Sequence, residues 1–409
     1  MSSSLSHIRV LDLSRVLAGP WCSQHLADLG AEVIKIERPG TGDETRAWGP
    51  PYLKDAEGND TTEAAYYLSC NRGKKSLTLD ISTKEGQDIV RRLAAKSDVV
   101  LENYKVGQLK KYDLGYDDLN AINPKIVYCS ITGFGQTGPW SHRPGYDFII
   151  QGLGGLMSIT GERDDLPGGG PQKVGVAVTD LMTGMYATIA ILAALTHRER
   201  SGAGQYIDMA LLDVSVAMLA NMNMNYLTSG QVPKRWGNAH PNVIPYQVFA
   251  CSDGHIIVAV GNDSQFRKFC EALGKTELGV DPRFATNSNR IRNRSDLIPL
   301  LEPLVKTRSR DAWVEALEAA GIPCGPINNI DQVFENPQVK ARGIKVEIPH
   351  ELAGKVPQVA SPMRFSETPI EYRVAPPTLG QHNEYVLREL LGMSPEDVER
   401  LRQQNVIDQ

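Results

Sequence analysis

An aspartate at the start of a long apolar stretch is the first candidate for chemistry in this chain. Asp180 lies where a segment of Val, Ala and Gly residues turns into an expected helix over residues 180–197. As an N-cap, its side-chain oxygen would accept a backbone N–H, a contact worth roughly 1 kcal/mol, and Thr179 could serve the same purpose. As a catalyst, the carboxylate could attack an activated acyl group or accept a proton. The local sequence leaves cap, nucleophile and base open.

Basic side chains gather near the ends of expected strands, where a phosphate-bearing ligand could bind. These residues are Arg38, Arg72, Lys74, Lys75, Lys110 and Lys111. Arg supplies forked donors and Lys supplies compact charges for phosphate oxygens. Taken singly, each could equally be ordinary solvated surface charge.

Other motifs carry weaker signals. The glycine-rich stretch 133–139 could offer backbone N–H groups to an anion, whereas 167–172 is typical of a surface turn. The segment 235–241, with Arg235, Trp236 and His240, could be a mobile substrate loop or a loop anchored by its tryptophan. The eight histidines do not cluster, so neither a Ser-His-Asp triad nor a metal site has support from spacing.

Strand and helix patterns alternate along the first part of the chain. Strands are expected at 7–14, 31–37, 76–80, 98–103 and 125–131, with helices at 19–30 and 83–95 between them. This alternation predicts an α/β fold with a Rossmann-like parallel sheet, although GxGxxG is absent. We expect 1–227 to form the first part of a large domain, 228–330 a smaller α+β domain, and 331–409 a return segment that completes the large domain.

Composition limits the class of protein. The chain has 409 residues, of which 41% are hydrophobic, and a net charge of −5, with no basic run that would suggest a nucleic-acid partner. Its six cysteines form no CxxC pair, which is typical of free thiols in a reduced compartment. The longest apolar helix, around 186–195, is expected to be too short for a membrane span, and no secretory signal is evident. We therefore expect a cytoplasmic protein without a membrane partner.

Six ordered motifs together resemble the class III coenzyme A transferases, relatives of formyl-CoA transferase and carnitine CoA-transferase, and the resemblance covers essentially the whole chain. The motifs are VLDLSRVLAGPWCSQHLADLGAEVIKIERPGTGDETR, CNRGKKSLTLD, ENYKVGQLKKYDLGY, SITGFGQTGP, GVAVTDLMTG and GIPCGPI. The resemblance implies that Asp180 is the nucleophile, forming an anhydride and then a thioester with CoA. It also implies an interlocked homodimer, no permanent cofactor and no metal.

The same resemblance implies a set of CoA contacts in this chain. They are Val16, Leu17, Arg38, Arg72, Lys74, Lys75, Asn103, Tyr104, Lys111 and Phe134. Formyl-CoA transferases carry Arg at the position of Lys111, Gln at that of Leu17, and a run of four glycines that is replaced here by the region 240–245. The first difference removes a bidentate phosphate contact, and the other two argue against a formyl or oxalate substrate.

The segments RWGNAHPNVIPYQVF, GNDSQF and GPINNIDQVF look most like the succinyl-CoA:glutarate CoA-transferase branch. The substrates implied are an acyl-CoA, with succinyl-CoA as donor, and a dicarboxylic acid such as glutarate, malate, itaconate, citramalate or adipate. The second carboxylate needs a basic partner, for which we expect Arg235 first, then Arg46 or His240.

Two alternatives stay open. One is an α-methylacyl-CoA racemase, but Tyr146 stands where such an enzyme needs histidine, and His142 is out of register by four residues. The other is a CoA-binding protein without catalysis.

Overall fold

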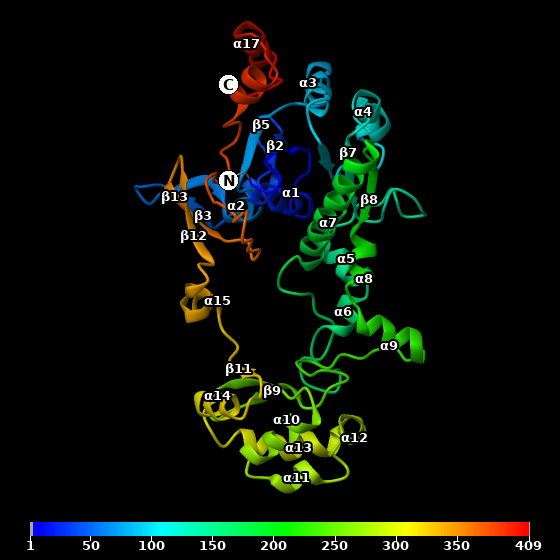
Figure 1. Ribbon diagram of the computed structural model, residues 1–409, viewed down its shortest axis with the longest axis vertical. Coiled ribbons are helices and arrows are strands. Elements are labelled where there is room, and N and C mark those ends of the chain that lie inside the picture. The colour runs from blue at the N-terminus through cyan, green and yellow to red at the C-terminus, as the bar shows by residue number, and fades with distance from the viewer. Residues whose placement is uncertain (1–2, 409) are drawn as a thin grey trace. The chain divides into compact units, whose positions relative to one another are not determined.

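Six parallel strands form one sheet in the first of two compact units (Figure 1). The computed structural model describes residues 3–408. The strands are β1 (Arg9–Asp12), β2 (Glu32–Glu37), β5 (Lys74–Thr78), β6 (Val99–Glu102), β7 (Val127–Thr132) and β8 (Tyr206–Ala210). The first unit comprises Met1–Leu156, Val174–Ser229 and Gln338–Gln409.

Alternate residues of each strand enter two different hydrophobic cores, one on each face of the sheet. Leu11 and Ile34 face one core, whereas their neighbours Val10 and Val33 face the other. Because successive side chains of a strand point to opposite faces, a sheet covered on both sides needs such nearly continuous apolar runs. The sheet is therefore the middle layer of an α/β unit.

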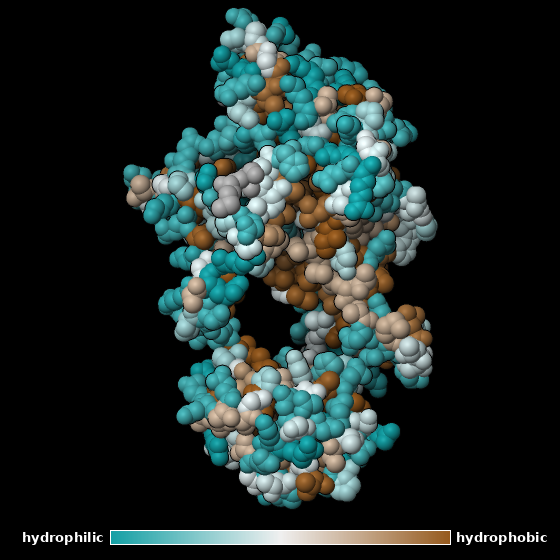
Figure 2. All heavy atoms as spheres, viewed as in Figure 1, coloured by the Kyte–Doolittle hydropathy of each residue, from teal (hydrophilic) through white to brown (hydrophobic). Residues whose placement is uncertain are grey.

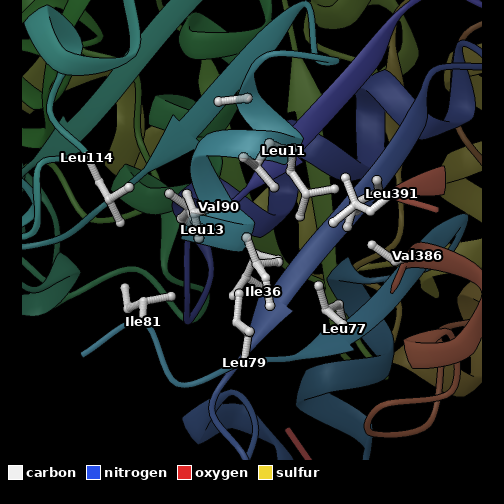
Figure 3. Packing of buried hydrophobic residues seen from close by; sticks show 14 of the residues in the cluster. Leu11, Leu13, Ile36, Leu77, Leu79, Ile81, Val90, Leu114, Val386 and Leu391 are labelled. Atoms are coloured by element: carbon white, nitrogen blue, oxygen red, sulfur yellow. The ribbon is translucent and has the colours of Figure 1, made fainter. Parts of the chain in front are cut away.

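Helices from distant parts of the chain cover the two faces. The first core, part of which is drawn in Figure 3, receives α3 (Lys84–Ala94), α4 (Tyr116–Ile122), the π-helix Tyr385–Leu390 and α17 (Pro395–Gln403). The second core receives α1 (Ala18–Asp28), α5 (Asp147–Leu153), α7 (Val178–Ser201) and α8 (Leu211–Ala217). The segment after residue 338 thus supplies helices to the same unit as the first strands.

The strand order is β5-β2-β1-β6-β7-β8. The chain first builds outward from β1 through β2 to β5, and then returns to the other side of β1 with β6. Ligands of such sheets bind outside the carboxyl ends of the strands, at the point where the order reverses. Here that point lies between β1 and β6, so the loops after Asp12 and Glu102 are expected to form a site.

Smaller elements complete the first unit. They are β3 (Tyr52–Lys54), β4 (Asp60–Ala64), α2 (Ala65–Cys70), α9 (Asn221–Ser229), β12 (Lys345–His350), β13 (Gly354–Val359) and two 3-10 helices, η1 (Glu44–Ala47) and η2 (Leu109–Tyr112). The pairs β3–β4 and β12–β13 are antiparallel hairpins.

The second unit comprises Met157–Lys173 and Gly230–Pro337 and has its own apolar core. Its elements include β9 (Tyr246–Ala250), β10 (His255–Ala259), β11 (Cys324–Gly325), α10 (Asp263–Ala272), α11 (Thr276–Val280), α12 (Asn287–Arg292), α13 (Arg294–Val305), α14 (Arg310–Ala319) and α15 (Ile330–Glu335). Residues 157–173 belong here rather than with the large domain of the prediction. The reason is that Arg235 donates to the carbonyl oxygens of Ser158 and Glu162.

The predicted α/β class with a parallel sheet is confirmed, whereas the expected length of the apolar helix was wrong. That helix, α7, runs over 24 residues and is long and apolar enough to cross a membrane by length and composition alone. Core helices of soluble proteins pass the same test, and one side of α7 packs against α1. Gly184 allows this packing, because a Cβ there would lie 2.7 Å from the carbonyl oxygen of Ala18.

Candidate active site

Asp147, rather than Asp180 or Thr179, caps the helix that carries the candidate nucleophile. Its Oδ1 accepts the backbone N–H groups of Thr179 at 2.8 Å and of Asp180 at 3.3 Å. Asp147 is the first residue of α5, and its Oδ2 accepts from Gln151 at 2.6 Å. The Thr179 hydroxyl is buried and has no hydrogen-bond partner in the described part of the chain. A carboxylate from another helix therefore does the capping that the local sequence assigned to Asp180.

The carboxylate of Asp180 is left free by this arrangement. Within residues 3–408 it accepts no hydrogen bond and forms no ion pair, although it is partly buried in the first turn of α7. Burial, and then the negative charge of Asp147, raises the pKa of Asp180 to about 7. An unpaired carboxylate with a pKa raised by burial is typical of a reactive group rather than of a structural one.

The loop after β1 faces Asp180 and is held in a strained conformation. Val16 has φ of 70°, a left-handed value that costs a β-branched residue free energy. Its N–H donates to the carboxylate of Asp43 at 3.2 Å, and Asn103 both accepts from and donates to the backbone of Arg15. Surrounding residues therefore determine the path of this loop.

A buried ion pair between Lys35 and Asp43 also holds the loop after β1 in place. The ammonium of Lys35 contacts Asp43 at 2.9 Å and the carbonyl oxygen of Ser14 at 2.9 Å, with both charged side chains fully buried. Burial disfavours the ionised form of Asp43, but Lys35 and the N–H donors outweigh it and hold the pKa of Asp43 below its usual value. Both ends of the loop are thus tied to fixed charges.

Two adjoining cavities open at the carboxyl ends of β1 and β6. The larger, about 670 Å³, is the Arg38 cavity, and the smaller, about 190 Å³, is the Asp180 cavity. Both are lined by Arg15, Glu44, Trp48 and Tyr104. A long ligand could therefore run from the first cavity into the second and present its end to Asp180.

Several predicted residues line these cavities, although their roles remain predictions. Val16, Leu17, Asn103 and Tyr104 line the Asp180 cavity with the candidate nucleophile, and the exposed Arg38 lines the larger one. They come from the loops after β1, β2 and β6, which the sheet order brings to one edge. Lys111 is exposed and lines neither cavity, and neither does Phe134.

Two residues predicted to bind phosphate are buried parts of the fold. Arg72 binds Asp28 through two nitrogens, at 2.8 and 2.6 Å, and donates to the carbonyl oxygen of Val359. Lys74 donates to the Pro20 carbonyl oxygen, to Asn71 and to Asp12. Both side chains are held by partners within the fold and line neither cavity, so the structure does not support the predicted phosphate contacts.

Lys75 is held almost as firmly at the surface of the first unit. Its ammonium pairs with Glu32 at 2.5 Å and lies over the Tyr385 ring, 3.6 Å from the centroid. Lys75 is therefore not a free cation for a phosphate. The chain's C-terminal segment, which carries Tyr385, covers this edge of the sheet.

Arg46, predicted as a partner for a substrate carboxylate, is also committed elsewhere. Its guanidinium binds Glu37 through two nitrogens, binds both oxygens of Glu63 and donates to the carbonyl oxygen of Pro377. All five donors are used, so the structure gives Arg46 a purely structural role. This corrects the prediction.

Arg235 and His240 belong to the second unit, where local contacts hold them. Arg235 pairs with Asp164, and His240 donates its backbone N–H to the carbonyl oxygen of Tyr246. Arg294 lies over the Trp236 ring, 3.9 Å from the centroid, and donates to the carbonyl oxygen of His240. These contacts favour the anchored loop over the mobile loop, and the substrate roles of Arg235 and His240 remain predictions.

Sequence reasoning missed several residues of the Asp180 cavity. Arg15, Trp48 and Arg143 line it, together with His142 and Tyr146, which sequence reasoning considered only for the racemase alternative. Arg15 carried a signal in the sequence, because it follows the first strand directly, but Arg143 lies outside every strand end. In residues 3–408 no group of three or more His, Cys, Asp or Glu could hold a metal ion.

The sequence model of CoA-transferase family III matches residues 5–383, so the chain belongs to this family and is an enzyme of the CoA-transferase class. It is 52% identical over 387 residues to the succinate–glutarate CoA-transferase of Agrobacterium fabrum, covering 94% of this chain and 95% of that protein. It is 44% identical to the succinyl-CoA:glutarate CoA-transferase of Mus musculus, covering 99% and 90%. A CAIB/BAIF family protein from Brucella suis has a TM-score of 0.83 and 51% identity, covering 95% and 100%.

Proposed function

We propose that this enzyme transfers CoA from succinyl-CoA to glutarate, with Asp180 as the nucleophile. The observation that carries this proposal is the free Asp180 carboxylate at the end of a long double cavity. Relatives that share 52% and 44% identity over most of the chain bear names that specify succinyl and glutarate substrates. The Arg38 cavity suits the nucleotide end of CoA, with the exposed guanidinium of Arg38 available to a phosphate.

The reaction divides into exchanges at one carboxylate. An Asp180 oxygen attacks the thioester carbonyl carbon of the donor, and the C–S bond breaks. CoA leaves as the thiolate, and Asp180 and the succinyl group remain joined as a mixed anhydride. The thiolate attacks the Asp180 carbonyl carbon and displaces succinate. The product on the enzyme is an aspartyl-CoA thioester. The acceptor carboxylate then attacks this thioester to form a second anhydride. The thiolate attacks the acceptor's carbonyl carbon, so that acyl-CoA leaves and Asp180 is restored.

Oxygen atoms that gain charge in these steps need donors nearby. Helix α1 begins at Ala18 without a side-chain cap, and Leu17 and Ala18 line the Asp180 cavity. Its first backbone N–H groups are therefore available to a thioester oxygen. The strained Val16 places this helix start beside the nucleophile, which gives the strain a role.

Replacing Asp180 tests the proposal directly. Asp180→Ala and Asp180→Asn should abolish exchange between succinyl-CoA and glutarate while CoA binding persists, measured by calorimetry. Incubation of the parent enzyme with succinyl-CoA should give an adduct on the Asp180 peptide, visible by mass spectrometry and released by hydroxylamine. Exchange at the parental rate in either variant would overturn the proposal.

The Asp180→Asn variant is also expected to keep the stability of the parent enzyme. Because the pKa of Asp180 is raised in the folded protein, its contribution to stability is present at low pH and is lost as pH rises through about 7. The variant should therefore unfold at a urea concentration no lower than the parent at pH 8, which separates lost chemistry from lost structure.

A second candidate function is proton transfer at the carbon beside the thioester. The observation that favours it is His142, which lines the same cavity as Asp180. Incubation of succinyl-CoA with the enzyme in deuterium oxide distinguishes the two. CoA transfer predicts no deuterium at that carbon, whereas an epimerase would incorporate it.

We also infer that the enzyme forms a homodimer. Large apolar side chains are exposed on α5, α7, α8 and α9, including Phe148, Ile189, Val216 and Leu227. Hydrophobic atoms gather over this part of the unit in Figure 2. Apolar surface of this extent is typical of a protein–protein contact, and the resemblance to the family supports a second copy as its partner.

A further inference from the structure

A dicarboxylic acceptor brings a second, non-reacting carboxylate into the Asp180 cavity. Removing this charge from water without a partner is costly, so an enzyme that selects such acids needs a cation close to the nucleophile. This requirement rests on the proposed function. Arg46 is committed to Glu37 and Glu63 and lines neither cavity, so the candidates for this cation are the basic residues that line the Asp180 cavity.

Three permanently basic side chains line the Asp180 cavity, namely Arg15, Lys105 and Arg143. Arg15 is already paired with Glu44, which lines the same cavity. Lys105 and Arg143 are exposed, and neither side chain has an ion pair or hydrogen bond to any residue from 3 to 408. Two cations are therefore available for a substrate carboxylate.

Arg143 is the better prepared of the two. Its guanidinium lies over the Trp140 ring, 4.7 Å from the centroid, and 5.4 Å from the centroid of Phe134. These two rings meet edge to face at 5.6 Å, so they form a fixed support for the guanidinium plane. A held guanidinium offers paired N–H donors that match both oxygens of a carboxylate, whereas Lys105 offers a single charge on a flexible stem.

The backbone around Arg143 is positioned by glycines. A Cβ on Gly133 would lie 2.5 Å from the Cα of Gly145, so the segment 141–146 packs directly on the turn that follows β7. The backbone N–H of Arg143 donates to the Trp140 carbonyl oxygen at 2.9 Å. The next residue after the segment is Asp147, which caps the helix of Asp180. One continuous stretch thus connects Arg143 to the nucleophile's helix.

We propose that Arg143 binds the non-reacting carboxylate of the acceptor acid and determines the preference for dicarboxylates. Phe134, for which the resemblance implies a contact with CoA, supports Arg143. The acid then lies between Arg143 at one end and the Asp180-bound acyl carbon at the other.

Selectivity between two acids of equal chain length measures this role. Glutarate and pentanoate differ only in the distal group, and both can be assayed with succinyl-CoA as donor. Arg143→Gln should raise the KM for glutarate by roughly 10- to 100-fold, the loss expected for a charged hydrogen bond. It should leave kcat/KM for pentanoate nearly unchanged, because this quantity describes only the steps after succinate has left. The ratio of the kcat/KM values for glutarate and pentanoate should therefore fall by the same factor. Arg143→Lys should recover part of the loss.

Lys105→Gln is the matched control, because Lys105 lines the same cavity and is also unpaired. Its glutarate-to-pentanoate ratio should equal that of the parent. A ratio that falls in Lys105→Gln and not in Arg143→Gln would overturn the assignment. If the parent enzyme transferred no CoA to glutarate at all, the proposed function would fail instead, which keeps the two failures distinct.

Discussion

Asp180 and Asp147 share one helix end but have different tasks. Asp147 accepts two backbone N–H groups of α7, and this leaves the Asp180 carboxylate without a partner. The same negative charge adds to burial in raising the pKa of Asp180. The cap therefore also tunes the proposed nucleophile, because a carboxylate with a raised pKa is more basic when ionised.

The pH dependence of activity should report this pair of residues. Since the ionised form of Asp180 attacks, kcat/KM for succinyl-CoA should rise as pH increases through about 7 and then level off. Asp147→Asn keeps an oxygen acceptor for the helix but removes the charge, which lowers the pKa of Asp180. The rising limb should therefore move to lower pH, measured by initial rates between pH 5 and 9. Asp88→Asn, at an exposed position on α3, should leave the limb unmoved.

The loops that carry the site are positioned by close backbone contacts rather than by their own sequence preferences. Val16 is strained, and the buried pair of Lys35 and Asp43 holds it in place. The turn after β7 reaches the segment 141–146 through two glycines, Gly133 and Gly145. A side chain at either glycine would separate elements that have to touch.

Gly133→Ala tests this contact at the level of the element. The new methyl group would meet the backbone of Gly145, and overpacking of this kind costs about 1–3 kcal/mol of unfolding free energy. We expect that loss in urea unfolding, together with a raised KM for glutarate. Gly325→Ala, where a Cβ meets nothing within 4 Å, should change neither quantity. Parental stability in Gly133→Ala would contradict the contact.

The sequence predicted the sheet better than it predicted the site. The buried strands reveal themselves through short, nearly continuous apolar runs, a local pattern, and Asp180 was proposed from its place at a helix start. Arg72 and Lys74 misled because charge near a strand end says nothing about burial, and Arg46 misled because a basic residue type says nothing about existing ion pairs. Their carboxylate partners come from other elements. The cap from Asp147 spans 33 residues of sequence, and no local pattern encodes such a contact.

At the scale of the whole molecule, α7 serves two surfaces of the first unit. One side packs on α1 and carries Asp180 at its start, and another side exposes Met185, Tyr186 and Ile189. An exposed apolar face of a helix that is otherwise part of a core is stable when another surface covers it. The proposed second copy would supply that cover.

Self-association can be tested on this face with a single charge. Ile189, which is 60% exposed, contributes apolar surface of α7, and Ile189→Asp should convert the dimer to monomer in light scattering. A buried carboxylate in the contact would be unpaired, so the loss should exceed tenfold in dimer affinity, on the order of 1.4 kcal/mol or more. Val280→Asp, at a 70% exposed position on α11, is the control and should remain dimeric. A parent chain that is monomeric would contradict the inference.

The close approach of Gly133 and Gly145 also has a consequence for how acid preference can change by mutation. Substitutions that affect the acid and substitutions that affect CoA fall in different segments of the chain. In the proposed function, the walls that would receive CoA come from the loops after β1, β2 and β6, and the segment 141–146, which would face the acid, packs on the turn after β7 through two glycines. Substitutions within 141–146 can alter which acid is accepted without disturbing the walls that would receive CoA. New acid preferences can therefore arise by a few point mutations, provided that both glycines are retained.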